Sequence, residues 1–466
     1  MGSGLGWDII PKMKIIASFL FLVLCLALFA PGCRKSPDAR VPRIRILENA
    51  VPGGINSEIY DWYQEQIPRI EQELGIKIEL APAGVSGENY KARVALDLEG
   101  GWAADIIGID QSWMPEFAEA GLLLPINDFL ITWPDRTQYD DSMIKMGSFR
   151  GRTYLVMRQT DLRMLFYHKE ILSRAGVPVP WQPQNWEDLL DAARKIKNKF
   201  PAITPLQINA GAEMGEATTT DGFLILLYAA GGELYDENLD KWVADSPAYR
   251  ESLNFYRRIY VYEGLASARL VTSAKAREKS YELFSKGKIA IYLESTGFYN
   301  SVLKPGGVWG VLDRDKRIGW ARMPGSGASY APRFISLSQG NGLVINPRSK
   351  DPYLAWQVME ELNTLPGLEK LFEKQPLTPA RKDLAQSEVF KQNRFISETA
   401  LALLPYTRSR PGLPEYPEVS FLIQLMTEEV ILGRSSPEEA LAKFRGELER
   451  VVGEENVIRK PGSQEF

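Results

Sequence analysis

The stretch ADIIGIDQSWMPEFAEAGLLLPI, at residues 104–126, decides the expected fold. It begins with a short apolar run at 106–109, of the kind that forms a buried parallel strand. Asp110 follows directly, Ser112 is placed to cap a helix, and Gly121 can end that helix in the left-handed conformation. Ligands of open α/β sheets sit just beyond the carboxyl ends of strands, which places Asp110 where a ligand is expected. A carboxylate that only caps the helix explains the pattern equally well.

The same alternation of strand and helix precedes this stretch. Alternating apolar residues at 43–47 and 76–80 predict two strands, and the pattern at 57–74 predicts a long helix between them. A shorter helix is expected at 90–98. Strand–helix–strand–helix order is typical of an α/β lobe with a largely parallel sheet.

A chain of 466 residues is long for one core, so two lobes are expected. Residues 149–156 and 164–167 predict strands, and the polar residues 158–161 lie between them. A polar break between two apolar strands is the pattern of a chain that crosses from one lobe to another. The net charge of -4 leaves no basic footprint, so a nucleic-acid partner is not expected.

The residue inventory excludes several kinds of chemistry. The chain has one histidine, His168, so no metal site can use two histidines. We interpret His168 as a surface or lobe-edge residue, because it directly follows an apolar strand beside Lys169. Of the two cysteines, Cys25 lies in the predicted signal peptide described below, so no cysteine pair survives its removal. No P-loop sequence is present, and neither a metal nor a cofactor is expected. Paired carboxylates of a glycosidase remain possible, with Asp110, Asp161 and Glu294 as candidates on position alone.

The N-terminal segment predicts export. An apolar run at 15–30 follows two lysines, is short for a membrane span, and has the size of a signal-peptide core. It leads into Cys33 through the sequence FAPGC, which resembles a bacterial lipobox. We therefore expect a lipoprotein signal peptide at 1–32 and a lipidated tether at 33–42, with Met13 as an alternative start. A signal-flanking cysteine without lipid is the alternative for Cys33.

Several stretches, in this order along the chain, support a family resemblance. Besides 104–126 they are RGRTYLVMRQTDLRMLFYHKEILSRAGV at 150–177, NWEDLLDAARKI at 185–196, YAAGGELYDE at 228–237, LFSKGKIAIYLESTGFYNSV at 283–302, NGLVINPRSKDPYLAWQVMEEL at 341–362 and PEYPEVSFLIQLMTEEVILGRSSPEEALAKF at 414–444. Together they resemble the extracellular solute-binding proteins of ABC importers, in the carbohydrate-binding group that includes the maltose/trehalose-binding proteins.

The resemblance implies an α/β fold of the periplasmic-binding-protein type, class II. Two α/β lobes are then joined by hinge crossings, with a ligand cleft between them. The implied N-terminal lobe is 41–157 plus 316–363, and the C-terminal lobe is 158–315 plus 364–466. The implied function is that of a lipid-anchored, monomeric receptor that captures a mono-, di- or oligosaccharide by lobe closure and delivers it to the permease.

The resemblance also implies particular site residues. Asp110 and Asp161 resemble cleft carboxylates that hold sugar hydroxyls, and Phe298 or Tyr299 resembles an aromatic platform under a sugar ring. For Asp161 the alternative is a cap or bridge at a hinge, and for Phe298 it is a core position.

Two further pairs complete the implied site. Gly340 and Asn341, after Gln339, match a turn that usually presents an aromatic residue, which is missing here. Arg408 and Arg410 resemble cleft arginines, and the alternative is that they are solvated or paired. A cell-surface glycosidase and a non-sugar (polyol) receptor or sensor of the same fold remain as alternative functions.

Overall fold

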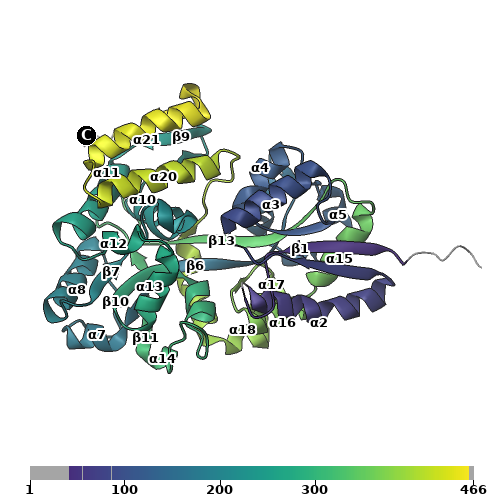
Figure 1. Cartoon of the computed structure of the whole chain (residues 1–466), viewed down its shortest axis with the longest axis horizontal. Helices are drawn as coiled ribbons and strands as arrows, with labels where there is room; N and C mark the ends of the chain where they lie inside the picture. The colour runs from purple at the N-terminus through teal and green to yellow at the C-terminus, as the bar shows by residue number, and fades with distance from the viewer. Residues whose placement is uncertain (1–40, 55, 86, 461–466) are drawn as a thin grey trace, which may run out of the picture.

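The computed structural model describes residues 41–54, 56–85 and 87–460. The predicted signal peptide, Cys33 and most of the tether lie outside these residues. The described chain forms two α/β lobes joined by long strands, which confirms the predicted class II fold (Figure 1). The first lobe lies on the right of Figure 1 and the second on the left.

The sheet of the first lobe contains the predicted parallel strands. β1 (Arg43–Glu48) lies between β2 (Lys77–Pro82) and β3 (Ile106–Asp110), and pairs with both in parallel. Every side chain from Ile106 to Ile109 is buried, as expected for a strand covered on both faces. The helices of this lobe are α2 (Ser57–Leu74), α3 (Gly87–Gly100), α4 (Met114–Glu119), α5 (Asn127–Thr132), α6 (Asp141–Met146), α15 (Pro352–Leu362), α16 (Leu365–Lys374) and α17 (Lys382–Gln386).

Two long antiparallel strands, β6 (Val156–His168) and β13 (Phe334–Ile345), cross between the lobes through the centre of Figure 1. β6 is apolar at both ends and polar in the middle, so each end packs into a different core while the polar part lies at the crossing. A bulge between Asn341 and Gly342 shifts the register of β13 at this point.

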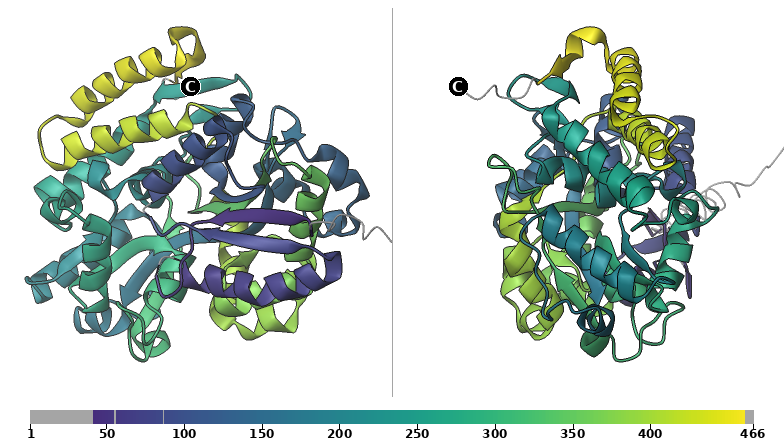
Figure 2. Two further views of the ribbon diagram at one scale, coloured as in Figure 1. Left: turned by 45° about the vertical axis from the view of Figure 1, so that its right-hand side comes forward. Right: turned by 90° about the vertical axis from the view of Figure 1, so that its left-hand side faces the viewer.

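The second lobe extends the sheet from β6. β10 (Ile289–Ser295) and β11 (Ile318–Ala321) both pair with β6, and β7 (Thr204–Gln207) pairs with β10. α20 (Tyr416–Ile431) and α21 (Pro437–Val452) pack together at the edge of this lobe (Figure 2). The other main helices of this lobe are α7 (Lys169–Arg174), α8 (Trp186–Lys199), α9 (Glu216–Thr218), α10 (Leu224–Ala229), α11 (Pro247–Arg257), α12 (Ala268–Val271), α13 (Ala276–Ser285), α14 (Arg314–Arg317) and α19 (Arg394–Leu403). α18 (Glu388–Gln392) packs against α16 and α17 of the first lobe and against α19.

The two large cores divide the chain at different points from those predicted. Met323 and Leu337 belong to the core of the second lobe, although 316–363 was assigned to the first. Leu371 and Leu384, on α16 and α17, belong to the core of the first lobe, although 364–466 was assigned to the second. The change of lobe takes place inside β13, at its polar middle, because the strand itself is the crossing.

His168 differs from the surface position expected for it. It is 4% exposed at the end of β6, and its Nε2 lies 2.7 Å from the carbonyl oxygen of Phe284 on α13. Burial lowers the pKa of His168 to about 4, so the ring is neutral and donates its Nε2 proton to that carbonyl. It is a structural residue that joins a helix to the sheet.

Candidate ligand-binding site

A cavity of about 550 Å³ lies between the lobes, beside the middle of the hinge strands. The carboxyl end of β3 and α3 border it from the first lobe, and α9, α13 and α20 border it from the second. In Figure 1, α20 faces α3 and α4 across this region. The polar residues of the lining are Lys91, Asp110, Ser112, Glu216, Thr220, Asp221, Arg277, Gln339, Arg410, Tyr416 and Gln424.

Asp110 lines this cavity and also caps the short helical turn Gln111–Trp113, so the capping interpretation is confirmed and ligand binding by Asp110 stays a prediction. Its Oδ1 accepts hydrogen bonds from the backbone nitrogen of Ser112, at 2.8 Å, and from the Ser112 hydroxyl, at 2.7 Å. These bonds fix the rotamer of the carboxylate at the end of β3. The Asp110 side chain is 32% exposed, so its remaining acceptor capacity faces the cavity.

Arg410 connects the two lobes. It lies on the segment between β15 (Thr407–Arg408) and α20, and its guanidinium donates to Asp110 from the first lobe and to Glu216 from the second, at 2.8 Å for Glu216. The Arg410 side chain is 1% exposed. Burial acts to lower the pKa of Arg410, but the charges of Asp110 and Glu216 outweigh it, so the pKa is raised and the charge is retained.

Glu216 is a cavity residue that the sequence analysis missed. Its Oε1 accepts from the Tyr416 hydroxyl and its Oε2 from the Ser420 hydroxyl, each at 2.6 Å. Both donors lie on α20, about two hundred residues away along the chain. Glu216 follows no predicted strand, so no local pattern marked it; only the packing of α20 against α9 brings it to the cavity.

Asp161 lies next to the cavity rather than in its lining. It stands opposite Gln339 in the β6–β13 ladder, and Arg163 donates to its carboxylate. Arg163 Nε also donates to Asp221 Oδ1, at 2.5 Å, and Asp221 lines the cavity. Burial raises the pKa of Asp161 in spite of the charge of Arg163. The bridge at the hinge that the sequence analysis gave as the alternative for Asp161 describes these contacts.

The network continues from Asp221 through Arg277 to Glu294. Arg277 Nη2 lies 3.3 Å from Asp221 Oδ2 and 3.0 Å from Glu294 Oε1. The Glu294 side chain is fully buried, and burial raises its pKa. Glu294 therefore lies behind the cavity wall, where it pairs with Arg277 and is out of contact with the cavity space.

Three polar atoms of the lining have no hydrogen-bond partner within the described residues. They are Arg277 Nε, Arg410 Nε and Gln339 Oε1, all of which are buried. Buried polar groups in proteins are nearly always hydrogen-bonded. All three atoms belong to residues that line the cavity, but each atom is itself inaccessible to solvent, so none of them forms part of the open cavity surface.

Phe298 and Tyr299 do not line this cavity. Phe298 is 1% exposed and packs edge-on against Phe166, with ring centroids 5.5 Å apart, which is the core position given above as its alternative. Tyr299 stacks on Phe395, with centroids 3.9 Å apart. The prediction that they form an aromatic platform in the cavity is therefore wrong. The π-helical turn that carries them packs into a hydrophobic cluster of the second lobe. The aromatic side chains of the cavity are those of Trp113, Tyr416 and Phe421.

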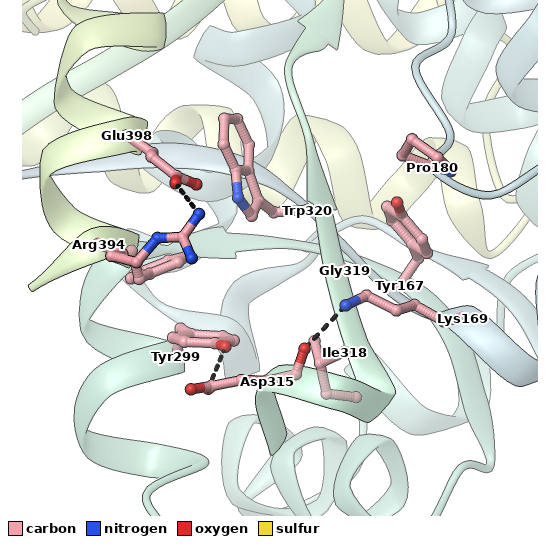
Figure 3. Close-up of a pocket in the computed structure, with 11 residues that line it drawn as sticks. Tyr167, Lys169, Pro180, Tyr299, Asp315, Ile318, Gly319, Trp320, Arg394 and Glu398 are labelled. Carbon is pink, nitrogen blue, oxygen red and sulfur yellow. Dashed lines mark hydrogen bonds and ion pairs between the residues drawn. The ribbon is translucent and has the colours of Figure 1, made fainter. Parts of the chain in front are cut away.

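Tyr299 instead borders a second pocket of about 530 Å³, shown in Figure 3. This pocket lies on the second lobe, between β11 and α19. Its polar groups are paired with one another: the Tyr299 hydroxyl donates to Asp315 at 2.6 Å, and Arg394 donates to Glu398 at 3.1 Å (Figure 3). The pocket therefore offers few free polar groups to a ligand.

Gly340 and Asn341 lie within β13 and form no turn. A Cβ on Gly340 would stand 2.4 Å from the carbonyl oxygen of Gln159, so no side chain fits there. Asn341 lies opposite Asp110 in the ladder, and its Oδ1 accepts from Arg158 at 3.1 Å. The expected turn is wrong because the adjacent glycines belong to the bulge of the hinge strand.

Of the two candidate arginines, only Arg410 lines the cavity. Arg408 is exposed, lies over the ring of Tyr228 with 5.4 Å to the centroid, and donates to the carbonyl of Gly232 at 3.3 Å. Arg408 ends β15, whereas Arg410 lies beyond the strand on the segment that leads to α20, so the two guanidinium groups meet different partners.

Comparison with known proteins identifies the class of this protein. Residues 54–364 match the model of the bacterial extracellular solute-binding protein family, and the chain belongs to that family. It is 21% identical over 419 residues to a putative binding protein of Brucella abortus (strain 2308), covering 90% of this chain and 95% of the relative.

Solved structures share the fold. An ABC transporter solute-binding protein of Thermotoga lettingae bound with α-D-tagatose is 24% identical, with a TM-score of 0.74, covering 88% of this chain and 100% of that one. Maltose-bound MalE3 of T. maritima is 22% identical, also with a TM-score of 0.74, over 88% of this chain and 100% of that one. These likenesses are below 25% identity and establish the shared architecture.

No helix in residues 41–460, apart from the two omitted positions, has the length and hydropathy of a membrane span. In the same part of the chain, no three His, Cys, Asp or Glu side chains are arranged to hold a metal ion.

Proposed function

We propose that this chain is the lipid-anchored solute-binding subunit of an ABC importer, and that it captures a neutral polyhydroxylated solute, a sugar or a related polyol, between its lobes. The lobes close around the solute, and the closed form delivers it to the permease. The observation that carries this proposal is the interlobe cavity, where Asp110, Arg410 and Glu216 meet.

The chemistry of the lining supports a polyhydroxylated guest. Hydroxyl groups both donate and accept, so they can pair with the carboxylates of Asp110 and Glu216 and with the guanidinium groups of Arg277 and Arg410, whose side chains line the cavity. A hydrogen bond to a charged group contributes about 1.5–3 kcal/mol, and a few of them reach the roughly -8 kcal/mol of a micromolar complex after ordering costs. Trp113, Tyr416 and Phe421 offer apolar rings to the C–H faces of the same solute.

The charges of the lining argue for a neutral ligand. The three cations Lys91, Arg277 and Arg410 are matched by the three carboxylates Asp110, Glu216 and Asp221. A guest with a net charge would pair with one of these groups and leave a group of the guest's own sign without a partner. An unpaired charge in a partly buried site costs free energy.

The test is a thermal-shift screen of the purified chain against mono- and disaccharides, polyols, amino acids and organic acids, followed by calorimetry on the hits. A ligand at one hundred times its Kd stabilises the folded state by about 2.7 kcal/mol, which raises the melting temperature measurably. Stabilisation by amino acids or acids alone, with no sugar or polyol effect, would contradict the proposal.

A second assay separates the receptor from the alternative glycosidase. The chain is incubated with the oligosaccharides that stabilise it, and the mixture is analysed by chromatography. A receptor leaves them intact, whereas release of shorter sugars that is lost in Asp110→Asn would favour the enzyme.

A further inference from the structure

The end of the first lobe opposite the interlobe cavity carries a broad groove of about 1120 Å³. The amino ends of the parallel strands β1 and β2 open into it, at Arg43 and Lys77. The cavity with Asp110 lies beyond the carboxyl end of β3, in the same parallel sheet, so the groove and the cavity lie at opposite ends of that sheet. The first described residue, Val41, borders the groove, so the chain enters the fold there.

The groove is a cationic surface on an acidic protein. Its basic side chains are Arg43, Arg45, Lys77, Arg348 and Lys350, and its acidic ones are Glu79, Asp105 and Asp351. The whole chain, in contrast, has a net charge of -4. The charge of the groove is therefore opposite in sign to the net charge of the whole chain.

The acidic groups of the groove are mostly engaged by the fold itself. Asp105 accepts from the backbone nitrogen of Arg45 at 2.8 Å and from the Ser349 hydroxyl at 2.6 Å. Asp351 caps α15 through the backbone nitrogen of Leu354 at 3.0 Å. Within the described residues, Arg43, Arg348 and Lys350 make no ion pair, and all three are exposed. Arg348 Nη1 donates to the carbonyl oxygens of Leu98, at 3.2 Å, and Glu99, at 3.1 Å, but no carboxylate of the described chain neutralises the three charges, which are therefore available to an outside partner.

An exposed tryptophan borders the same groove. Trp102 is 67% exposed; its ring lies over Gly100, and its Nε1 donates to Asp97 at 3.1 Å. An indole is a large apolar surface to leave in water. Tryptophan beside lysine and arginine is the typical composition of a surface that meets lipid headgroups.

We propose that this end of the first lobe rests on an anionic lipid surface, with Trp102 at the headgroup level and Arg43, Arg348 and Lys350 over lipid phosphates. The inference rests on the lipid anchor of the proposed function. Seven residues, 34–40, separate Cys33 from Val41, and the eight residue-to-residue steps between them span at most about 28 Å when fully extended. An anchored chain is therefore held within reach of the bilayer at this end.

The consequence is a defined resting pose. With the amino ends of the strands on the membrane, the interlobe cavity opens away from the lipid, where it meets solute. Attraction between cations and an anionic surface falls off within a Debye length, which is about 10 Å at 0.1 M salt. A higher salt concentration should therefore detach this end of the first lobe from the membrane.

The test uses the full chain in vesicles whose acyl chains are brominated, made from phosphatidylcholine alone or with about 30% phosphatidylglycerol. We expect quenching of tryptophan fluorescence only in the anionic vesicles, its loss in 0.5 M salt, and its loss in Trp102→Phe. Trp309→Phe, on the second lobe, is the matched control and should leave the quenching unchanged.

The contribution of the positive charges is tested with two double variants. Arg43→Gln with Lys350→Gln should weaken the contact about 25-fold, since each cation near an anionic surface contributes about a fivefold factor. Lys279→Gln with Lys288→Gln removes two exposed cations of the second lobe and should have no effect. Equal quenching in neutral vesicles, or quenching that survives Trp102→Phe, would overturn the inference.

The lipid anchor at Cys33 and the contact of the groove with lipid can be tested separately. Mass spectrometry of the N-terminal peptide shows whether Cys33 carries lipid, and calorimetry in solution shows whether the variants still bind the solute. An unlipidated Cys33 refutes the anchor, and with it the resting pose. A lipidated chain that binds solute but shows no quenching refutes only the surface contact.

Discussion

At the scale of single residues, Asp110 has both a structural and a binding role. Its carboxylate is held by Ser112 and by Arg410, and its remaining oxygen surface faces the cavity. Asp110→Ala should lower ligand affinity by about a hundredfold, as expected for the loss of one or two hydrogen bonds to a charged group. Calorimetry with the ligand found in the screen measures this loss.

The stability of the same variant should change little. Loss of a helix cap costs about 0.5–2 kcal/mol, and Arg410 keeps Glu216 as a partner. Arg408→Gln is the matched control, because Arg408 lies outside the cavity and its loss should leave affinity unchanged. If Asp110→Ala binds as tightly as the wild type, Asp110 is not part of the site.

At the scale of secondary-structure elements, His168 couples β6 to α13 and makes their packing sensitive to acid. The pKa of His168 is lowered to about 4 by burial, whereas an unfolded chain has the ordinary value of about 6.5. The unfolded state therefore binds more protons between these values, and stability falls as the pH falls from about 6.5 to about 4. The loss amounts to about 3 kcal/mol, from about 1.4 kcal/mol per pH unit.

Denaturant unfolding at pH 7, 6, 5 and 4.5 measures this effect in wild type and in His168→Gln. Glutamine can still donate to the Phe284 carbonyl but does not titrate, so the variant should lose less stability on acidification. Parallel curves for the two proteins would show that His168 is not the group responsible. Since the chain has one histidine, no other imidazole contributes to the difference.

At the scale of the whole molecule, Arg410 is the charged contact that closes the cleft from inside. Removal of its guanidinium leaves the carboxylates of Asp110 and Glu216 on opposite lobes without a cation between them. Two like charges at such a site repel each other. Arg410→Gln should therefore open the lobes and raise the radius of gyration measured by small-angle X-ray scattering.

Lys145→Gln provides the matched control for this measurement. Lys145 also forms an ion pair between the lobes, with Glu237 at 3.2 Å, but both side chains are 77% exposed. Exposed ion pairs contribute about 0–1 kcal/mol, so the variant should keep the radius of the wild type. An unchanged radius in Arg410→Gln would mean that the crossing strands alone set the distance between the lobes.

The sequence determined the features that depend on neighbouring residues. Periodicity predicted β1, β2 and the helix between them, because burial on one face of an element repeats with its own geometry, and a continuous apolar run predicted β3. It also placed Asp110 at the carboxyl end of a strand, and the polar middle of β6 at the crossing between lobes.

The tertiary structure decided which distant residues meet. Glu216 and Arg277 line the cavity only because of the packing of helices. Phe298 does not line it, because its turn faces the core. The lobe boundary within β13 and the burial of His168 have the same origin. Each of these depends on contacts between segments far apart in the chain, and such contacts leave no periodic signal in the sequence around either partner.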